Sequence, residues 1–290
     1  MHRVTQILIV GGTHGNELTG VRTVEQWPQL LARMDTSQIE FNTLMANPEA
    51  VEQRIRFVEE DLNRQFSANA LSETPTSLEA KRAKTLYQQF GQDSDKQPDL
   101  VIDIHNTTSN MGTTLILIER NPFNQALARY IHQQLPTCNL LLEDDQDYSD
   151  HPYLCSLGKY GVMIEMGAQP QGVCRADIFA DSMALLSNIV AFASQWNKQS
   201  LTDLPKAPVY QFIENIGFPL DNNDRVSAMI HPSLQDADFC RLNKGQPIFT
   251  KFDGNDLQWD SEETVYPHFI NEAAYQGTNV AFATARKIDW

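Results

Sequence analysis

Cysteine is scarce in this chain and forms no recognisable motif. The four cysteines are Cys138, Cys155, Cys174 and Cys240. No two of them have C-x-x-C spacing, so neither a zinc knuckle nor a thioredoxin-type redox site is predicted. We expect reduced thiols packed in the protein interior.

Long apolar runs are also missing. No stretch approaches the roughly 18 apolar residues that a membrane-spanning helix needs. The first residues, MHRVTQILIVGG, lack the apolar region and the small-residue cleavage site of a signal peptide. We therefore expect a cytoplasmic protein with no membrane partner.

Positive charge is in short supply. The 290 residues include 22 Lys and Arg against 37 Asp and Glu, which gives a formal net charge of −15. Nucleic acids and anionic membranes both attract basic surfaces, so neither is an expected partner. If the substrate is an anion, particular arginines in a pocket must overcome the field of the whole protein, which makes the positions of the arginines informative.

Apolar runs alternate with helical patterns over the first 200 residues. The runs that predict buried strands are 6–10, 41–46, 99–105, 113–118, 139–143 and 161–166. The patterns that predict helices are 18–34, 77–91, 121–135 and 175–197. This alternation is typical of an α/β domain with a parallel or mixed sheet. Beyond a polar, proline-containing connector, turn signals and short β-prone runs predict a smaller β-rich domain at 201–290, after an α/β domain at 1–200.

The stretch VGGTHGNELTG (10–20) ends the first predicted strand. Its two leading glycines permit a sharp turn into a helix. His14 and Glu17 are three residues apart, a spacing that brings both side chains to one side of the turn. Imidazole and carboxylate are ligands that zinc accepts. The alternative is an ordinary helix start, in which Glu17 favours the helix dipole.

A third candidate ligand follows another apolar strand. In LVIDIHNTTSNMG, His105 lies at the carboxyl end of the run, and Asp103 shares its face of the strand. Two buried polar groups need partners, which a bound zinc ion supported by a carboxylate would supply. The alternative is a hydrogen-bonded His–Asp pair. Taken with His14 and Glu17, the pattern favours zinc, because catalytic zinc commonly binds two histidines and a carboxylate.

Two further stretches carry candidate catalytic and binding residues. GVMIEMGAQPQG places Glu165 at the end of an apolar strand, where it could take a proton from water and pass it to a leaving amine. The alternative is a hydrogen-bonded carboxylate. IRFVEEDLNRQF gathers Arg56, Asn63 and Arg64. Arginine holds carboxylates bidentately and stabilises oxyanions, although a salt-bridged surface helix has the same composition.

Together these stretches resemble the aspartoacylase family, zinc-dependent amidohydrolases related to carboxypeptidase A. The resemblance rests on GGTHGNELTG, DLNR, DIHNTTSNMG, GAQPQGVCRADI and FINEAAY, which occur in the family's order. It implies a carboxypeptidase-like three-layer α/β domain with a mixed sheet, and a β-rich domain bordering the active-site channel. The implied substrate is a small anionic N-acyl-amino acid. A homodimer is an expectation at the level of the family.

The resemblance also implies roles for individual residues. His14, Glu17 and His105 would bind one zinc ion per chain, and Glu165 would act as general base and acid. Arg56 would polarise the scissile carbonyl. The residues implied in substrate binding are Asn63 and Arg64, which would grip the α-carboxylate, and Asn106, Thr107 and Tyr275, which would line the pocket.

One departure bears on the substrate. The family's N-acetylaspartate-cleaving members carry a further arginine for the side-chain carboxylate, and here Cys155 stands where we align it. Lys159 is a nearby cation whose position the sequence does not fix. The first expectation is aspartoacylase-like hydrolysis of N-acetyl-L-aspartate to acetate and L-aspartate. The alternatives are an aminoacylase-3-like deacylase of N-acetylated aromatic or S-conjugated amino acids, a desuccinylase or carboxypeptidase, and a catalytically silent zinc-containing binding protein.

Overall fold

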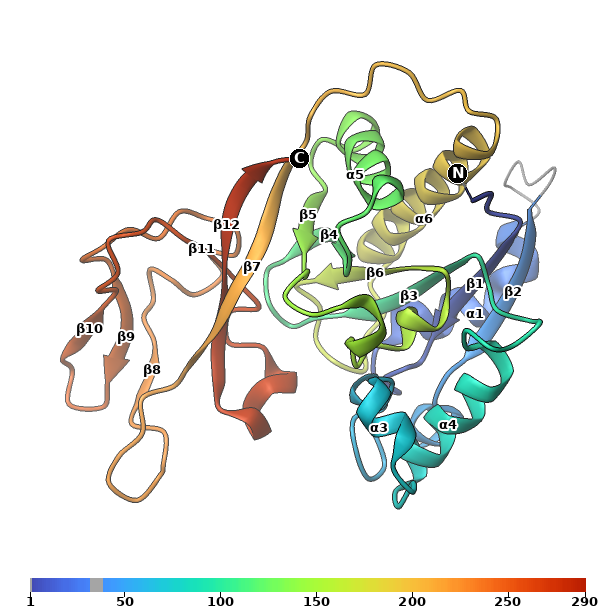
Figure 1. Ribbon diagram of the computed structural model, residues 1–290. Coiled ribbons are helices and arrows are strands. Elements are labelled where there is room, and N and C mark those ends of the chain that lie inside the picture. Colours follow the sequence, from blue (N-terminus) through green and yellow to red (C-terminus); the bar gives the residue numbers. More distant parts are fainter. Residues whose placement is uncertain (1, 32–38) are drawn as a thin grey trace.

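A mixed sheet of nine strands runs through the protein (Figure 1). The computed structural model describes residues 2–31 and 39–290. The strands of the first 200 residues are β1 (Gln6–Gly11), β2 (Glu40–Met45), β3 (Leu100–Asn106), β4 (Gly112–Leu117), β5 (Asn139–Leu142) and β6 (Tyr160–Gly167). All six apolar runs form the predicted strands, and each boundary lies within one residue of its expected position.

Among the described residues, six α-helices connect and cover these strands. They are α1 (Leu18–Leu31), α2 (Pro48–Gln53), α3 (Ala68–Ser72), α4 (Leu78–Phe90), α5 (Pro122–Gln134) and α6 (Ala176–Asn197). The same part of the chain also forms four 3₁₀ helices: η1 (Leu62–Arg64), η2 (Tyr148–Asp150), η3 (Leu154–Leu157) and η4 (Ala273–Thr278). The four predicted helices are confirmed over the described residues, and positions 32–34 of the first lie outside them.

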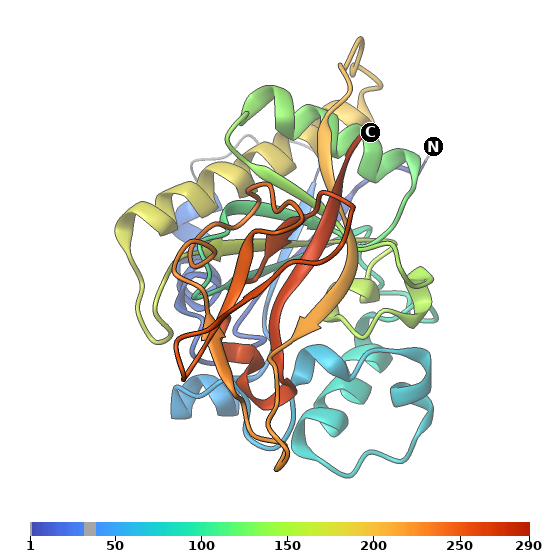
Figure 2. The same ribbon diagram turned by 90° about the vertical axis from the view of Figure 1, so that its left-hand side faces the viewer.

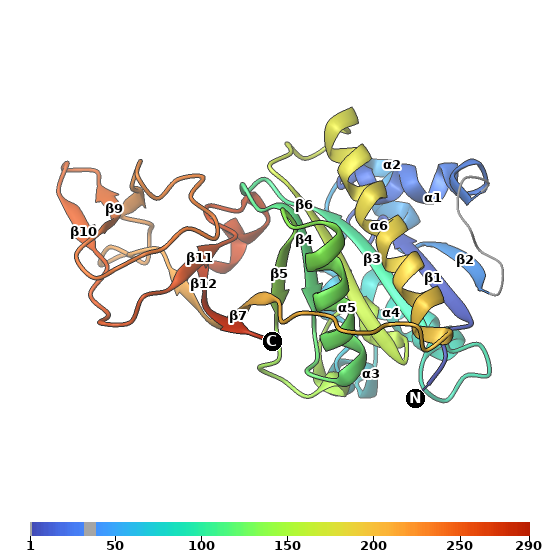
Figure 3. The same cartoon turned by 90° about the horizontal axis from the view of Figure 1, so that it is seen from above.

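Both faces of the sheet are buried, which explains why its strands read as continuous apolar runs. Along β1, Ile7 and Ile9 face the layer of α1, α5 and α6, whereas Leu8 and Val10 face α4. Figure 3 shows α5 and α6 crossing one face. Each fully buried Ile or Leu contributes roughly 1.5–3 kcal/mol. The expected three-layer α/β architecture is therefore confirmed.

Helix α6 has the length and hydropathy of a membrane-spanning segment, and among the described residues it is the only helix that does. In this fold Leu185, Ile189 and Phe192 pack into the core between α6 and the sheet. A core helix of a globular protein passes the same test of length and composition, so the feature is weak evidence for a membrane span.

The last 90 residues form strands in two sheets. They are β7 (Pro208–Gly217), β8 (Ala228–Ile230), β9 (Pro247–Lys251), β10 (Asp256–Gln258), β11 (Tyr266–His268) and β12 (Val280–Asp289). Strands β8, β9 and β10 form a small antiparallel sheet, whereas β7, β12 and β11 extend the main sheet beyond β5. Figure 2 shows this C-terminal part in orange and red, nearest the viewer. The predicted β-rich segment is thus continuous with the α/β domain through β7, which pairs with β5 in parallel.

One expectation about side-chain burial needs correction. All four cysteines are free, but Cys174 and Cys240 are exposed instead of packed, because both lie outside the helices and strands. Two histidines outside the metal-binding cluster, His151 and His268, are buried. His268 belongs to β11, where its ring stacks on Phe239 with 5.8 Å between centroids.

Candidate metal centre and active site

The turn after β1 and the first turn of α1 pack tightly against two neighbouring segments. Gly12 has a φ of +68°, which side-chain-bearing residues rarely adopt. A Cβ on Gly15 would lie 2.1 Å from the carbonyl carbon of Ala50 in α2, and a Cβ on Gly20 would lie 2.3 Å from the carbonyl oxygen of Ile104 in β3. The glycines therefore let this turn approach β3 closely enough for its side chains to meet His105.

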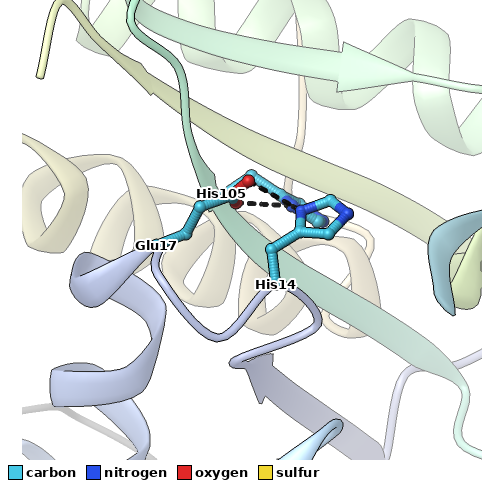
Figure 4. Close-up of side chains that lie close together, drawn as sticks. All are labelled: His14, Glu17 and His105. Carbon is cyan, nitrogen blue, oxygen red and sulfur yellow. Dashed lines mark hydrogen bonds and ion pairs between the residues drawn. The ribbon is translucent and has the colours of Figure 1, made fainter. Parts of the chain in front are cut away.

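His14, Glu17 and His105 converge at this point, as predicted (Figure 4). The Oε1 atom of Glu17 lies 2.7 Å from Nδ1 of His14, and its Oε2 lies 2.9 Å from Nδ1 of His105. The two Nδ1 atoms are 3.2 Å apart, and all three side chains are buried. Two imidazole nitrogens and a carboxylate facing one point form a donor set for a divalent cation.

A carboxylate lies behind each histidine. Asp61 Oδ1 is 2.9 Å from Nε2 of His14, and Asp103 Oδ2 is 2.9 Å from Nε2 of His105. Thr13 also donates a hydrogen bond to Asp103, at 2.9 Å. Such outer carboxylates keep a proton on Nε2 and turn Nδ1 towards a metal. Asp103 was expected as a partner of His105, whereas the role of Asp61 was not anticipated.

The field in this cluster favours a cation. Burial acts to raise the pKa of Glu17, but the imidazoles of His14 and His105 outweigh it and hold that pKa well below its ordinary value. Burial acts to lower the pKa of His105, but Asp103 and Glu17 raise it well above the ordinary value. The donor set, its burial and its outer carboxylates together fit a bound divalent metal.

Glu165 lies on β6 beside this cluster. In the parallel pairing of β3 and β6 it is the register partner of His105. Its Oε1 atom is buried and has no hydrogen-bond partner among the described residues. Burial raises its pKa well above the ordinary value, and the carboxylates of Glu17 and Glu272 act in the same direction. A buried carboxyl group with a free oxygen and a raised pKa is suited to proton transfer.

The IRFVEEDLNRQF stretch is a loop that ends in η1, so the surface-helix alternative is wrong. The guanidinium of Arg56 donates to Glu17 Oε1 at 2.9 Å and to Asp61 Oδ2 at 3.0 Å. Arg64, by contrast, forms no ion pair within 4.0 Å with any carboxylate in the described part of the chain. The guanidinium of Arg64 lies 5.3 Å from the centre of the Tyr153 ring and faces the pocket.

Asn63 is fixed by its own hydrogen bonds. Its side-chain oxygen accepts from the backbone N–H of Leu154 at 2.8 Å, which leaves the amide NH₂ group directed towards Met163 Sδ, 3.8 Å away. Since both Asn63 and Met163 line the pocket, the NH₂ group can donate to a ligand beside Arg64.

Glu272 joins the C-terminal segment by hydrogen bonds to the loop at 107–109, which follows the metal-binding His105. Its carboxylate accepts hydrogen bonds from Thr107 Oγ1, from the backbone N–H of Thr108 at 2.7 Å and from that of Ser109 at 3.2 Å. It also caps η4, which carries Tyr275 into the pocket wall. Glu272 stands in the FINEAAY stretch, but its partners are 163 to 165 residues away, so the sequence offered no signal for this contact.

Asn106 and Thr107 both lie on the pocket wall, as expected. The side chain of Asn106, however, is occupied within the protein. Its oxygen accepts from the backbone N–H of Thr19 at 3.0 Å, and its NH₂ donates to the carbonyl of Met166 at 3.3 Å. Its backbone N–H donates to Glu17 Oε2 at 3.0 Å. Asn106 therefore fixes the metal-binding turn to β3 and β6.

All ten sequence-predicted site residues line one pocket. The wall also contains groups that sequence reasoning missed, namely Ile116, Glu143, Tyr153, Met163, Phe269, Glu272 and Ala274. Glu143 accepts a hydrogen bond from Tyr153 Oη at 2.8 Å. It directly follows β5, so a polar residue at a strand end was the available signal.

Cys155 and Lys159 do not replace the missing arginine. Cys155 is fully buried in the apolar core between the sheet and α4, away from the pocket wall. Burial raises the pKa of its thiol well above the ordinary value. Lys159 pairs with Asp99 at 2.9 Å, near the start of β3 and hence at the opposite edge of the sheet from His105. Neither side chain can bind a ligand in this pocket.

Two histidines and a carboxylate form a ligand set used by zinc hydrolases, and their position at the edge of an α/β sheet places the protein among metal-dependent hydrolases. Residues 3–193 match the succinylglutamate desuccinylase/aspartoacylase catalytic domain, and residues 205–287 match the AstE/AspA barrel-sandwich hybrid domain. The chain belongs to the aspartoacylase family and is an amidohydrolase of that family.

Three relatives illustrate the similarity. The N-acyl-aromatic-L-amino acid amidohydrolase (carboxylate-forming) of Xenopus tropicalis is 40% identical over 98% of this chain and 93% of its own length. Aspartoacylase of Rattus norvegicus is 39% identical over the same shares, 98% and 93%. The crystal structure of murine aminoacylase 3 matches with a TM-score of 0.91 at 36% identity, covering 99% of this chain and 97% of that one.

Proposed function

We propose that the protein is a zinc-dependent deacylase that hydrolyses N-acyl-amino acids with uncharged, preferably aromatic, side chains. The observation that carries the choice of substrate is the charge of the pocket. Of its two arginines, Arg56 is held by two carboxylates, and Arg64 alone is free to bind one carboxylate. The pocket thus has one free arginine for the one carboxylate that every N-acyl-amino acid carries.

His14, Glu17 and His105 would hold one zinc ion per chain. When bound, zinc would act as a Lewis acid on the substrate's amide carbonyl and would make a water molecule more acidic. The NH₂ group of Asn63 and the guanidinium of Arg64 bind the α-carboxylate of the substrate. This places the scissile amide between them and the metal-binding residues, an arrangement that lowers the entropic barrier to attack.

Glu165 acts as the general base and then as the general acid. Its free Oε1 takes a proton from the attacking water while the carbon–oxygen bond forms. Arg56 stabilises the negative charge that develops on the carbonyl oxygen. Glu165 returns the proton to the amide nitrogen as the carbon–nitrogen bond breaks. The products are a carboxylate and a free amino acid.

The rest of the pocket suits a bulky uncharged side chain. Ile116, Met163 and the rings of Tyr153, Phe269 and Tyr275 line its wall. An adjoining hollow shares five lining residues with it and extends towards β7 and β12. A second substrate carboxylate would instead meet Glu143, and an unpaired buried charge costs several kcal/mol.

The second candidate substrate is N-acetyl-L-aspartate. It is favoured by the 39% identity to rat aspartoacylase over 98% of the chain, which is close to the 40% identity to the N-acyl-aromatic enzyme of Xenopus tropicalis. Its side-chain carboxylate would require a cation that the described pocket residues lack.

A substrate panel separates these candidates. Zinc-loaded protein is assayed with N-acetyl-L-tyrosine, N-acetyl-L-aspartate, N-succinyl-L-glutamate and a dipeptide. We expect kcat/KM to be at least tenfold higher for N-acetyl-L-tyrosine than for N-acetyl-L-aspartate. Preference for N-acetyl-L-aspartate would overturn the charge argument, and hydrolysis of none of the four would support a binding protein.

A further inference from the structure

The carboxylate of Asp61 contacts three parts of the site at once. Its Oδ1 atom lies 2.9 Å from Nε2 of His14 and accepts the backbone N–H of Asn63, also at 2.9 Å. Its Oδ2 atom accepts from Nη2 of Arg56 at 3.0 Å. One short side chain therefore joins a metal-binding histidine, the buried arginine and the turn that carries the carboxylate-binding pair.

Asp61 also determines the shape of that turn. It is the N-cap residue of η1, and its backbone carbonyl accepts the N–H of Arg64 at 3.0 Å and the side-chain amide of Gln65 at 3.3 Å. Its side chain is 17% exposed, so water cannot readily replace all of these contacts. Any shift of the carboxylate moves His14 and the Asn63–Arg64 turn together.

Asp103 provides a natural comparison. It lies beside the other histidine, His105, at an equal distance of 2.9 Å from Nε2, and its hydrogen bonds come from Thr13. Asp103 has no hydrogen bond to η1 among the described residues. The two aspartates therefore share the task of orienting a histidine and differ in their connection to the substrate-binding turn.

We infer that Asp61 is a positioning residue that couples metal binding at His14 to the binding of the substrate's α-carboxylate by Asn63 and Arg64. The inference rests on the proposed function, which assigns the carboxylate to that pair. Because such coupling is reciprocal, an occupied metal site favours the turn conformation that binds substrate, and bound substrate favours the metal.

The test compares Asp61→Asn with Asp103→Asn in the full-length protein. Asparagine has nearly the same shape but lacks the charge, and at position 61 its NH₂ group would face Nη2 of Arg56, donor against donor. Zinc affinity is measured by competition with a chromophoric chelator. The KM and kcat for N-acetyl-L-tyrosine are measured at saturating zinc, and thermal unfolding shows whether each variant is folded.

We expect both variants to bind zinc about 10- to 100-fold more weakly, since each loses the carboxylate behind a histidine. At saturating zinc, Asp61→Asn should raise KM about tenfold or more, whereas Asp103→Asn should leave KM within about twofold of the wild type. An unchanged KM in Asp61→Asn, or an equal rise in both variants, would overturn the inference. Failure of the proposed function would appear in the wild-type protein itself, as zinc binding without hydrolysis.

Discussion

Replacing Glu165 by glutamine tests the assignment of the general base. Glutamine has almost the same volume as glutamate but cannot accept a proton at neutral pH. Because Oε1 of Glu165 has no hydrogen-bond partner in the described structure, the substitution breaks no contact of that atom. General acid–base catalysis contributes about 10²- to 10⁴-fold, so kcat should fall by that factor, which corresponds to roughly 3–5.5 kcal/mol of activation free energy.

The zinc site should survive this change, since its donors are His14, Glu17 and His105. Fold stability should survive as well. Burial raises the pKa of Glu165 in the folded protein, so the contribution of this carboxyl group to stability is lost as pH rises through that pKa. Glutamine stays neutral and shows no such loss. The variant should therefore unfold at the same temperature as the wild type, or higher, above neutral pH.

The assay follows release of the free amino acid from N-acetyl-L-tyrosine with an amine-reactive fluorophore, and zinc content is measured on the same samples. A kcat within tenfold of the wild type, with zinc present, would refute the role of Glu165. Loss of zinc together with activity would instead make Glu165 part of the metal site.

Three further predictions concern binding, packing and pH. Arg64→Met should raise KM for N-acetyl-L-tyrosine about 10- to 100-fold in steady-state assays, because one charge-assisted contact is lost; an unchanged KM would remove Arg64 from the carboxylate site. Gly15→Ala places a Cβ 2.1 Å from the backbone of Ala50 and should lower the free energy of unfolding by about 2–4 kcal/mol in urea titrations. The control Gly277→Ala, whose added Cβ would have no atom within 4 Å, should change that free energy by less than about 0.5 kcal/mol. Equal effects of the two substitutions would contradict the close packing at Gly15. Burial raises the pKa of Asp238 from 3.8 to about 7, so its contribution to stability is present below pH 4 and lost as pH rises to 7. The difference in urea midpoint between the wild type and Asp238→Asn should therefore shift in favour of the variant over that range. A difference that is constant with pH would contradict this prediction.

Most of the α/β domain could be predicted from the sequence because its signals are local. The runs at 6–10 and 99–105 are mostly apolar, and the strands that they form are buried on both faces. The metal-binding residues could also be predicted from the sequence, for a related reason. His14 follows β1 and His105 lies near the end of β3, and the carboxyl ends of these neighbouring parallel strands meet at one edge of the sheet.

What could not be predicted depends on contacts between distant segments. That β7 continues the main sheet is a pairing between residues about 70 positions apart, and no local pattern encodes it. The hydrogen bonds of Glu272 to the 107–109 loop are likewise non-local. Alignment placed Cys155 where an arginine was expected, but only the packing of η3 shows that this position is buried in the core.

The same limit applies to the substrate. The sequence showed which arginines were present but not which of them are already paired. The structure shows that Arg56 is bound to Glu17 and Asp61, whereas Arg64 faces the pocket and forms no ion pair within 4.0 Å among the described residues. This difference between two arginines eight positions apart carries the proposal of an uncharged substrate side chain.

In the proposed mechanism, deacylation requires a zinc ion held by His14, Glu17 and His105. The most direct measurement is metal content and N-acetyl-L-tyrosine hydrolysis on one preparation, before chelation, after chelation and after zinc is restored. We predict about one zinc per chain, loss of activity when the metal is removed and recovery when it is restored, whereas His14→Ala should neither hold zinc nor hydrolyse the substrate. Full activity in metal-free protein, or zinc uptake unaffected by His14→Ala, would contradict this mechanism.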